Sequence, residues 1–377
     1  SDLTQVLGDL GADVIVIEGA TLETNRVMGP GPHPQLSGTA LNLMRNKRSV
    51  RIDFKHPQGR EALLRIAASC DVVITNLRPS ALRRAGLLYE DLASRRPDIV
   101  YCEAHGWPSD SERADDPAYD DVIQAGTGVA DAFLRQTGSP SLVPTIFVDK
   151  LCGLTIAYAV IAALFERERT GRGKRIEVPM SAAAAAFILV EHGAGAIPEP
   201  PTGPPGYSRI LSPYRRPQRT ADGWIHVLPY SRSHYEAVFA SAPADLRVDP
   251  ELYGSARARI ANADRLYTQL HAVLATRSTG QWMAYLRAQG VPATEITSLD
   301  DLVAGLPLAE HPVVGNYRQI PPPVRFGGEP DTTRAIRRPA PLVGEHTEEV
   351  LAEVGLGAAE VTALRELGAI PPDPEDR

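Results

Sequence analysis

The alternation of β-branched runs with amphipathic segments along the first 192 residues constrains the fold most strongly. Compact apolar runs at 12–18, 71–76, 97–107 and 174–180 predict strands. The segment 57–70 has helical periodicity and a proline near its start. Strands separated by helices need crossover connections, which join parallel strands. We therefore predict an α/β fold with a mostly parallel sheet covered by helices on both faces.

Two polar residues follow strands of this predicted sheet. Asn76 and His105 lie at or just beyond the ends of the runs 71–76 and 97–107. Ligands of open parallel sheets bind beyond the carboxyl ends of the strands. The loops after these two residues are therefore candidate binding loops.

The chain of 377 residues exceeds what one hydrophobic core usually organises, so we expect two domains. The segment 193–206 is rich in proline and glycine and predicts a linker or mobile loop. A second αβ section follows it, with a strand at "DGWIHVLP" and helices at 263–275 and 280–289. Two short helices, "HTEEVLAEVGL" and "AAEVTALRELG", close the chain.

Charge and cysteine content narrow the class of protein. A net charge of −7 argues against a nucleic-acid partner, which needs a basic surface. Cys70, Cys102 and Cys152 share no motif spacing, which favours a reducing cytoplasm. The uncharged run 151–165 is shorter than the about 20 apolar residues of a membrane span and predicts a buried helix. We expect neither a membrane partner nor a signal peptide.

Metal and nicotinamide sites lack their sequence signals. The nine histidines show no close pairing with cysteines or carboxylates at ligand spacing, so we predict no metal. Gly8, Gly11 and a strand ending at Glu18 faintly resemble a dinucleotide fingerprint, but the G-x-G-x-x-G turn is absent from this position. We therefore predict no NAD site.

Asp149 stands at the start of the apolar run "PTIFVDKLCGLTIAYAVIAALF" (144–165). One interpretation is a helix N-cap, worth about 1 kcal/mol. The other is a nucleophile, because the helix dipole and backbone N–H donors lower the pKa of a carboxyl group there. A poorly hydrated carboxylate beside apolar residues is also more reactive than one in water. The two roles are compatible, and local sequence does not choose between them.

Two basic segments lie in this acidic protein. "MRNKRSVRIDFK" (44–55) carries Arg45, Lys47 and Arg48 just before a predicted strand, and "NLRPSALRRAG" (76–86) carries Arg78, Arg83 and Arg84 after one. The simplest interpretation of the first segment is a solvated charged strand. The alternative is a polyphosphate site, because arginine and phosphate form charge-assisted hydrogen bonds. Together the segments indicate a phosphorylated cofactor with an adenine-sized apolar slot near Ile52 and Phe54.

These residues resemble the class III CoA-transferases, a family that includes formyl-CoA transferase, carnitine and bile-acid CoA-transferases and α-methylacyl-CoA racemase. Six blocks match in family order along the whole chain, among them "LGDLGADVIVIE", "RNKRSVRIDFKHPQGREALLRIAASCDVVITNLRP" and "PAPLVGEHTEEVLAEVGL". The resemblance implies a Rossmann-like large domain, a smaller α/β domain and an interlocked homodimer. It places the large, CoA-binding domain at 1–195, linker and small domain at 196–325, and a segment returning to the large domain at 326–377. The family normally begins about 20 residues earlier.

The resemblance also assigns roles to single residues. Asp149 falls on the nucleophilic aspartate of the family. The positions that fall on its CoA-binding surface are Arg48, Ile52, Phe54, Asn76, Leu77, Arg78, Arg84 and Met180. Acyl-CoA is then a substrate, alongside a carboxylic acid.

Tyr119 separates two branches of the family. Racemases carry a His-Asp pair 30 residues before the aspartate, and here the segment reads "PAYDDVIQAGTG" with Tyr119 in place of the histidine. A tyrosine with an ordinary pKa of about 10 is a poor base at neutral pH, whereas histidine titrates at about 6.5. Tyr119 therefore resembles the transferases, and Asp149 and Tyr119 are the candidate catalytic residues. We expect a CoA-transferase with a covalent aspartyl intermediate. The alternatives are an α-methylacyl-CoA racemase or epimerase and a non-catalytic acyl-CoA-binding homologue.

Overall fold

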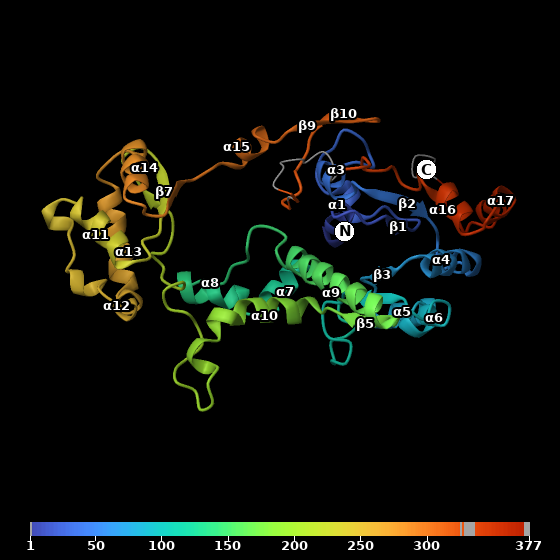
Figure 1. The fold of residues 1–377 in the computed structure, drawn as a ribbon, viewed down its shortest axis with the longest axis horizontal. Helices are drawn as coiled ribbons and strands as arrows, with labels where there is room; N and C mark the ends of the chain where they lie inside the picture. Colours follow the sequence, from blue (N-terminus) through green and yellow to red (C-terminus); the bar gives the residue numbers. More distant parts are fainter. Residues whose placement is uncertain (1, 325, 328–335, 373–377) are drawn as a thin grey trace. The chain divides into compact units, whose positions relative to one another are not determined.

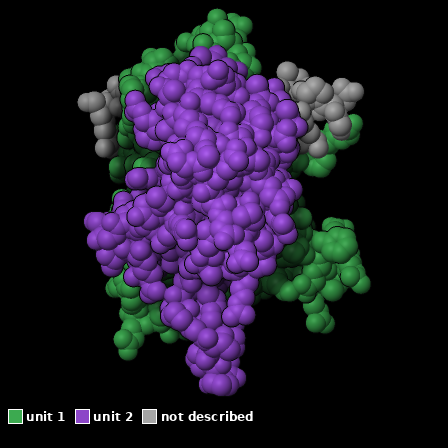
Figure 2. Space-filling model, turned by 90° about the vertical axis from the view of Figure 1, so that its left-hand side faces the viewer, with its two compact units in different colours: residues 1–127, 143–185, 306–377 green, residues 128–142, 186–305 purple. Residues whose placement is uncertain are grey.

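The computed structural model describes residues 2–324, 326–327 and 336–372, and the chain folds as a mixed α/β protein (Figure 1). It divides into two compact units (Figure 2). Unit 1 comprises residues 1–127, 143–185 and 306–377, and unit 2 comprises 128–142 and 186–305. The domain boundaries expected from the sequence, at 195 and 325, stay a prediction.

Unit 1 contains parallel β-structure, as the sequence predicts. β1 (Val14–Glu18) pairs with β2 (Lys47–Arg51). β4 (Val100–Glu103) pairs on one side with β3 (Val72–Thr75) and on the other with β5 (Lys174–Glu177). In the part of the chain that the structure describes, these five strands form two separate parallel sheets and not the one sheet that the sequence predicts. The carboxyl ends of β3, β4 and β5 are in register, because Thr75 pairs with Glu103 and Glu103 with Glu177.

Two helices of unit 1 begin at a proline. The predicted helix at 57–70 is α4 (Pro57–Ser69), with Pro57 in its first turn, where the missing N–H costs no hydrogen bond. α5 (Pro79–Ala85) also begins at a proline, and its C-cap residue, Gly86, has the left-handed φ of 63° that favours glycine. The other helices of this unit are α1 (Asp2–Asp9), α2 (Thr24–Val27), α3 (Gly38–Leu43), α6 (Tyr89–Ala93), α7 (Asp120–Gly126), α9 (Val148–Thr170), α16 (Thr347–Glu353) and α17 (Ala358–Glu366). The antiparallel strands β9 (Leu308–His311) and β10 (Gly315–Arg318) also belong to it.

The closing helices α16 and α17 pack on the first sheet. Val350 and Leu351 of α16 share a core with Val50 and Ile52. Residues from both ends of the sequence therefore build one hydrophobic core around β2.

α9 is the helix predicted around the apolar run, and it is only partly buried. One side packs against α1 and β4 through residues such as Cys152, Ile156 and Val160. The other side is exposed, with Tyr158 at 65% and Phe165 at 67% exposure. The expectation of a buried helix is thus wrong for this face, because nothing in the described chain covers it. By length and composition alone α9 could cross a membrane, but core helices of soluble proteins meet the same criterion.

Unit 2 has its own core. β7 (Trp224–Val227), the strand predicted at "DGWIHVLP", lies between β6 (Gln218–Arg219) and β8 (Ala293–Glu295) in an antiparallel sheet. α13 and α14, at the positions predicted for helices, pack on it through fully buried Leu270 and Trp282. The helices of this unit are α8 (Val129–Thr137), α11 (Arg232–Ala240), α12 (Ala256–Ala261), α13 (Ala263–Leu274), α14 (Thr279–Ala288) and α15 (Leu299–Ala304). α10 (Met180–His192) starts in unit 1 and ends in unit 2.

The predicted linker at 193–206 is closed by backbone hydrogen bonds. The N–H of Gly206 donates to the carbonyl of His192 at 2.7 Å, and that of Thr202 to Gly195 at 2.8 Å. Only a single 3₁₀ turn, Ala194–Ala196, forms within it, as its proline and glycine content predicts.

Candidate active site at the start of helix α9

Asp149 lies in the first turn of α9, as the sequence predicts, but it is not the N-cap. The N-cap position is occupied by Phe147, whose side chain cannot accept a hydrogen bond. The capping interpretation of Asp149 is therefore wrong: its backbone is already helical. Asp149 is exposed in the single chain, so the residues of one chain do not shield its carboxylate from water.

Asp120 accepts the backbone N–H of Asp149. Its Oδ1 lies 3.0 Å from that nitrogen, and Asp120 is only 8% exposed. The other oxygen, Oδ2, accepts from Nε2 of Gln124 at 2.5 Å. Gln124 is fully buried, and its Oε1 accepts the N–H of Val143 at 2.9 Å. This chain of hydrogen bonds, called here the Asp120–Gln124 relay, connects α7, the start of α9 and the segment that leads into α9.

Tyr119 and Met180 lie near the same helix start. Tyr119 is the N-cap residue of α7, next to Asp120, and its side chain is 77% exposed. Met180 begins α10 and packs against a small core that we call the Trp107 cluster. This cluster consists of Trp107, Ile123, Val148 and Ala184, with Ala118, Phe147 and Met180 at its margin. Ala118, which precedes Tyr119, and Val148, which precedes Asp149, therefore share one cluster with Met180.

The loop after β4 connects this site to the basic helix α5. Its Asp115 accepts the N–H of Ser80 on Oδ1 at 2.9 Å, and its carbonyl accepts from Arg78 at 2.9 Å. The Ser80 N–H, with Arg78 and Arg83 nearby, holds the pKa of the Asp115 carboxyl below its ordinary value. The same loop needs glycine at Gly106, where a Cβ would lie 2.1 Å from that of Ala118. The predicted binding loops therefore meet at the carboxyl ends of β3 and β4.

The residues predicted to bind CoA around α5 are exposed. Asn76 and Arg78 lie between β3 and α5, and Arg84 lies in the last turn of α5. Leu77 is partly buried and shares a hydrophobic cluster with Phe54. This part of unit 1 therefore offers guanidinium groups to solvent beside an apolar cluster, and CoA binding by these residues stays a prediction.

The basic segment before and on β2 has a different environment. All five residues of β2 are buried, so the interpretation as a solvated charged strand is wrong. Arg48 is 4% exposed and contacts Asp13 at 2.6 Å, Glu353 at 2.7 Å and Glu349 at 3.1 Å. Burial alone would lower the pKa of Arg48, but its hydrogen bonds to Glu353 and Asp13 raise that pKa above the ordinary value.

Ile52 also lies inside the protein. It is fully buried in the core that β2 shares with α16. Its expected contact with adenine, like the expected contact of Arg48 with CoA, stays a prediction. Neither the core around Ile52 nor the carboxylates around Arg48 include a residue of the first turn of α9.

A buried carboxylate stands at the end of β4. Glu103 is 1% exposed and accepts from Arg175 at 2.5 Å, with Nε2 of His105 at 3.4 Å. Burial would raise the pKa of Glu103, but His105 and Arg175 together lower it below the ordinary value. Glu103 is therefore ionised and fixes the strand end from which the predicted binding loop begins.

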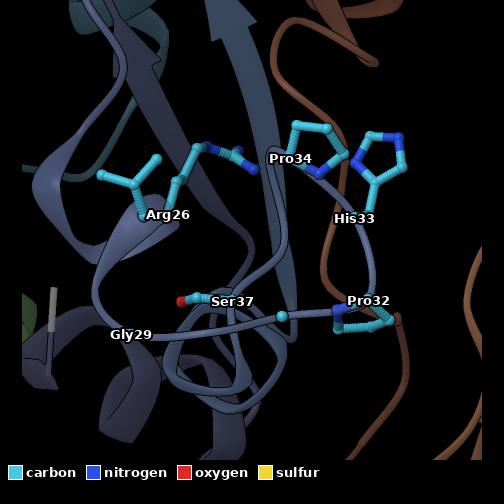
Figure 3. A pocket seen from close by; sticks show the side chains of 8 residues that line it. Arg26, Gly29, Pro32, His33, Pro34 and Ser37 are labelled. Carbon is cyan, nitrogen blue, oxygen red and sulfur yellow. The ribbon is translucent and has the colours of Figure 1, made fainter.

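A separate pocket of about 330 Å³ is lined by the end of α2 and the loop that leads to α3 (Figure 3). Its lining is formed by Arg26, Val27, Gly29, Gly31, Pro32, His33, Pro34 and Ser37. Arg26 is fully buried and forms a two-pronged ion pair with Glu18, at 2.5 and 2.6 Å. In the described chain no group of three or more His, Cys, Asp or Glu side chains is arranged to hold a metal.

The structural roles of Asp120 and Gln124 were not predicted from the sequence. Both face the interior from α7, with a spacing of four residues that places them on one side of a helix. That spacing was the available signal, but their partners Asp149 and Val143 lie 29 and 19 residues away in sequence. No local pattern predicts such pairings.

Comparison with known proteins gives consistent matches. A family model described as CoA-transferase family III matches residues 3–347. A probable fatty acyl-CoA transferase of Mycobacterium tuberculosis is 29% identical over 375 residues, covering 92% of this chain and 92% of that protein. Succinyl-CoA:glutarate CoA-transferase of Mus musculus is 29% identical over 362 residues, covering 93% of this chain and 82% of that protein. The crystal structure of a CAIB/BAIF family protein from Brucella suis has a TM-score of 0.74 at 25% identity, covering 93% of this chain and 94% of that one.

Proposed function

The chain belongs to CoA-transferase family III, and from this premise we propose that it moves CoA from an acyl-CoA thioester to a carboxylic acid through a covalent intermediate on Asp149. The observation that carries the proposal is the position of this carboxylate. It is exposed in the first turn of α9, and a buried side chain fixes the backbone N–H of the same residue. An accessible carboxylate on a rigid element suits a nucleophile.

The proposed reaction has four steps. The Asp149 carboxylate attacks the thioester carbonyl of the donor, which releases CoA thiolate and leaves a mixed anhydride. The thiolate attacks the aspartyl carbonyl, which releases the donor acid and forms an aspartyl-CoA thioester. The acceptor carboxylate attacks this thioester, which forms a second mixed anhydride and again frees the thiolate. Thiolate attack on the acceptor carbonyl then gives the new acyl-CoA and restores Asp149.

The other candidate residues have supporting places in this scheme. We propose that Arg78 and Arg84, both exposed around α5, bind phosphate groups of CoA. Tyr119 lies next to Asp120, which holds Asp149, so its exposed ring would contact the acyl group. The scheme uses acyl-CoA as a substrate and requires neither a metal nor NAD.

We further propose that two copies of the chain form the homodimer that the family resemblance implies. Leu154, Tyr158, Ile161 and Phe165 are spaced four, three and four residues apart on α9, and all are 47% to 67% exposed. A continuous apolar stripe of this kind needs cover from a partner. We assign the cover to a second copy, and with free Cys70, Cys102 and Cys152 we propose a cytoplasmic location.

Trapping of the covalent intermediate tests the function. The protein is incubated with a panel of acyl-CoA donors and acids, treated with borohydride or hydroxylamine, digested, and examined by mass spectrometry. We expect modification at Asp149 and loss of transfer in Asp149→Ala, with Asp121→Ala, an exposed residue of α7, as the control. CoA transfer with full activity in Asp149→Ala would refute the proposal. Deuterium entering the α-carbon of a 2-methylacyl-CoA without an acceptor would instead indicate a racemase.

The oligomeric state tests the dimer. Sedimentation analysis of the wild type should give twice the mass of the chain, and Tyr158→Glu combined with Phe165→Glu should give monomers. Glu168→Ala, an exposed change on the same helix, should leave the mass unchanged. A monomeric wild type at micromolar concentration would overturn the assignment.

A further inference from the structure

We infer that Asp120 and Gln124 are positioning residues for the nucleophile: the Asp120–Gln124 relay fixes the first turn of α9, and with it the direction of the Asp149 carboxylate. The inference rests on the proposed function for its catalytic consequence. Its structural content is independent of that function, because it concerns the backbone of Asp149.

The relay is built entirely from protein groups in buried positions. Asp120 is 8% exposed and Gln124 is fully buried, so neither has water as an alternative partner of equal quality. The three hydrogen bonds measure 3.0 Å from Asp149 N–H to Asp120, 2.5 Å from Gln124 to Asp120, and 2.9 Å from Val143 N–H to Gln124. Each donor in the relay has one acceptor, so the donor and the acceptor of all three hydrogen bonds are fixed.

The relay replaces an ordinary helix cap. The N-cap residue Phe147 has no side-chain acceptor, so the first N–H groups of α9 need a partner from elsewhere. Asp120 supplies it from α7, which belongs to another part of the sequence. A cap from the same helix would move together with that helix. Asp120 lies on α7, so its hydrogen bond fixes the start of α9 relative to α7 and thus relative to Tyr119.

The hydrogen bond from Val143 N–H to Gln124 restrains the segment that leads into α9. Val143 begins the segment that leads through Ile146 to Asp149, and its N–H is held by the same side chain that holds Asp120. Loss of the relay would release both ends of this segment. Since a displacement of about 1 Å at a reacting group costs about 100-fold in rate, positional freedom here would be visible in kcat.

A charge swap tests the relay without removing its hydrogen bonds. In Asp120→Asn alone, the new amide NH₂ faces the NH₂ of Gln124, so one donor is unsatisfied. In Gln124→Glu alone, two buried carboxylates face each other. In the double variant, the amide of Asp120→Asn donates to the carboxylate of Gln124→Glu. That carboxylate still accepts Val143 N–H, and the remaining amide oxygen still accepts Asp149 N–H.

We expect a fall in kcat of about 10- to 100-fold in each single variant, with KM for acyl-CoA within about twofold of the wild type. The double variant should return kcat to within about threefold. Asp121→Asn, the same chemical change at the exposed neighbouring position, should keep wild-type kcat. Amide hydrogen exchange in peptides spanning 143–152 should be faster in the single variants and normal in the double variant.

The two readouts separate this inference from the proposed function. If the wild type transfers no CoA and is never modified at Asp149, the proposed function fails, and hydrogen exchange still decides the positioning role. Wild-type exchange over 143–152 in Asp120→Asn would overturn the inference. If the single variants do not fold, the double variant decides: a folded protein with wild-type exchange supports the relay, and one with fast exchange refutes it.

Discussion

Arg45 and Arg48, before and on β2, are buried among carboxylates, whereas Arg83 and Arg84, on α5, are exposed to solvent. Both pairs belong to unit 1. The first pair lies before and on the parallel strand β2, and the second lies on the helix that follows the parallel strand β3. Arg45 contacts Asp9 at 2.6 Å, and Arg48 contacts three carboxylates. The first pair therefore holds segments of the chain together, and the second pair is available for a ligand.

The difference arises from partners that are distant in sequence. β2 lies beside β1 and is covered by α16, which brings Glu349 and Glu353 to Arg48 across more than 300 residues of sequence. α5 is short, and its Leu82 alone is fully packed, so its other side chains face outward. Arginine density alone thus does not distinguish a phosphate site from a structural ion-pair network.

The largest expected effect is on stability, in Arg45→Met. The substitution keeps the side-chain volume but leaves the Asp9 carboxylate, with 8% side-chain exposure, without its charged partner. Breaking a buried pair costs about 3–5 kcal/mol in the free energy of unfolding. Urea unfolding measures this loss. The exposed change Arg84→Met should cost about 0.5 kcal/mol or less.

A companion variant sharpens this test. Arg45→Met together with Asp9→Leu removes both charges, so part of the lost stability should return. Equal losses in Arg45→Met and Arg84→Met would show that burial does not separate the two arginine pairs.

Glu103→Gln tests a pair of intermediate exposure, in which the carboxylate is buried and Arg175 is 44% exposed. Loss of charged hydrogen bonds should cost about 2 kcal/mol at pH 7. Because the pKa of Glu103 in the folded protein lies below its ordinary value of 4.5, this stabilisation is complete above pH 4.5. It is lost as pH falls through the lower, folded-state pKa.

Unfolding of the wild type and of Glu103→Gln between pH 3 and pH 7 measures this dependence. The difference between the two proteins should shrink below pH 4.5. Glu112→Gln, an exposed change in the loop after β4, provides the control. A difference that grows toward low pH would contradict the assigned direction of the pKa.

Much of the fold could be predicted because local patterns determine it. The β-branched run at 12–18 and the proline-started segment at 57–70 became β1 and α4 at nearly the expected bounds. The exposed face of α9 could not be predicted, because the helix is apolar on all sides and no polar stripe marks a solvent face. Asp149 could be proposed as a candidate from its position in the sequence. Asp120, which accepts the N–H of Asp149, could not, because the two residues meet only when α7 and α9 pack together.

Ligand binding gives the next effect in size. Arg84→Ala, and Arg78→Ala beside it, should each raise the Kd for CoA about tenfold, which is about 1.4 kcal/mol. Their unfolding free energies should change by about 0.5 kcal/mol or less. Isothermal titration at two salt concentrations measures the affinity, and Arg95→Ala, partly exposed on the loop after α6, should bind CoA normally. Wild-type affinity in both variants would show that the exposed arginines around α5 do not bind CoA.

The smallest effect concerns Glu61 and Arg95, an exposed pair with the two-pronged geometry of the buried ones. Arg95 donates to Glu61 at 2.9 and 2.8 Å, and the side chains are 37% and 47% exposed. The hydrogen bond from Arg95 holds the pKa of Glu61 below its ordinary value, but solvent screens the pair. A double-mutant cycle with Glu61→Ala and Arg95→Ala should give a coupling of about 0.5 kcal/mol or less, reduced further by 0.5 M salt. The same cycle on Arg45 and Asp9 should give a larger coupling that salt changes little. If the exposed pair coupled as strongly, burial would not separate the two kinds of arginine, and exposure would no longer support the proposal that α5 binds the ligand.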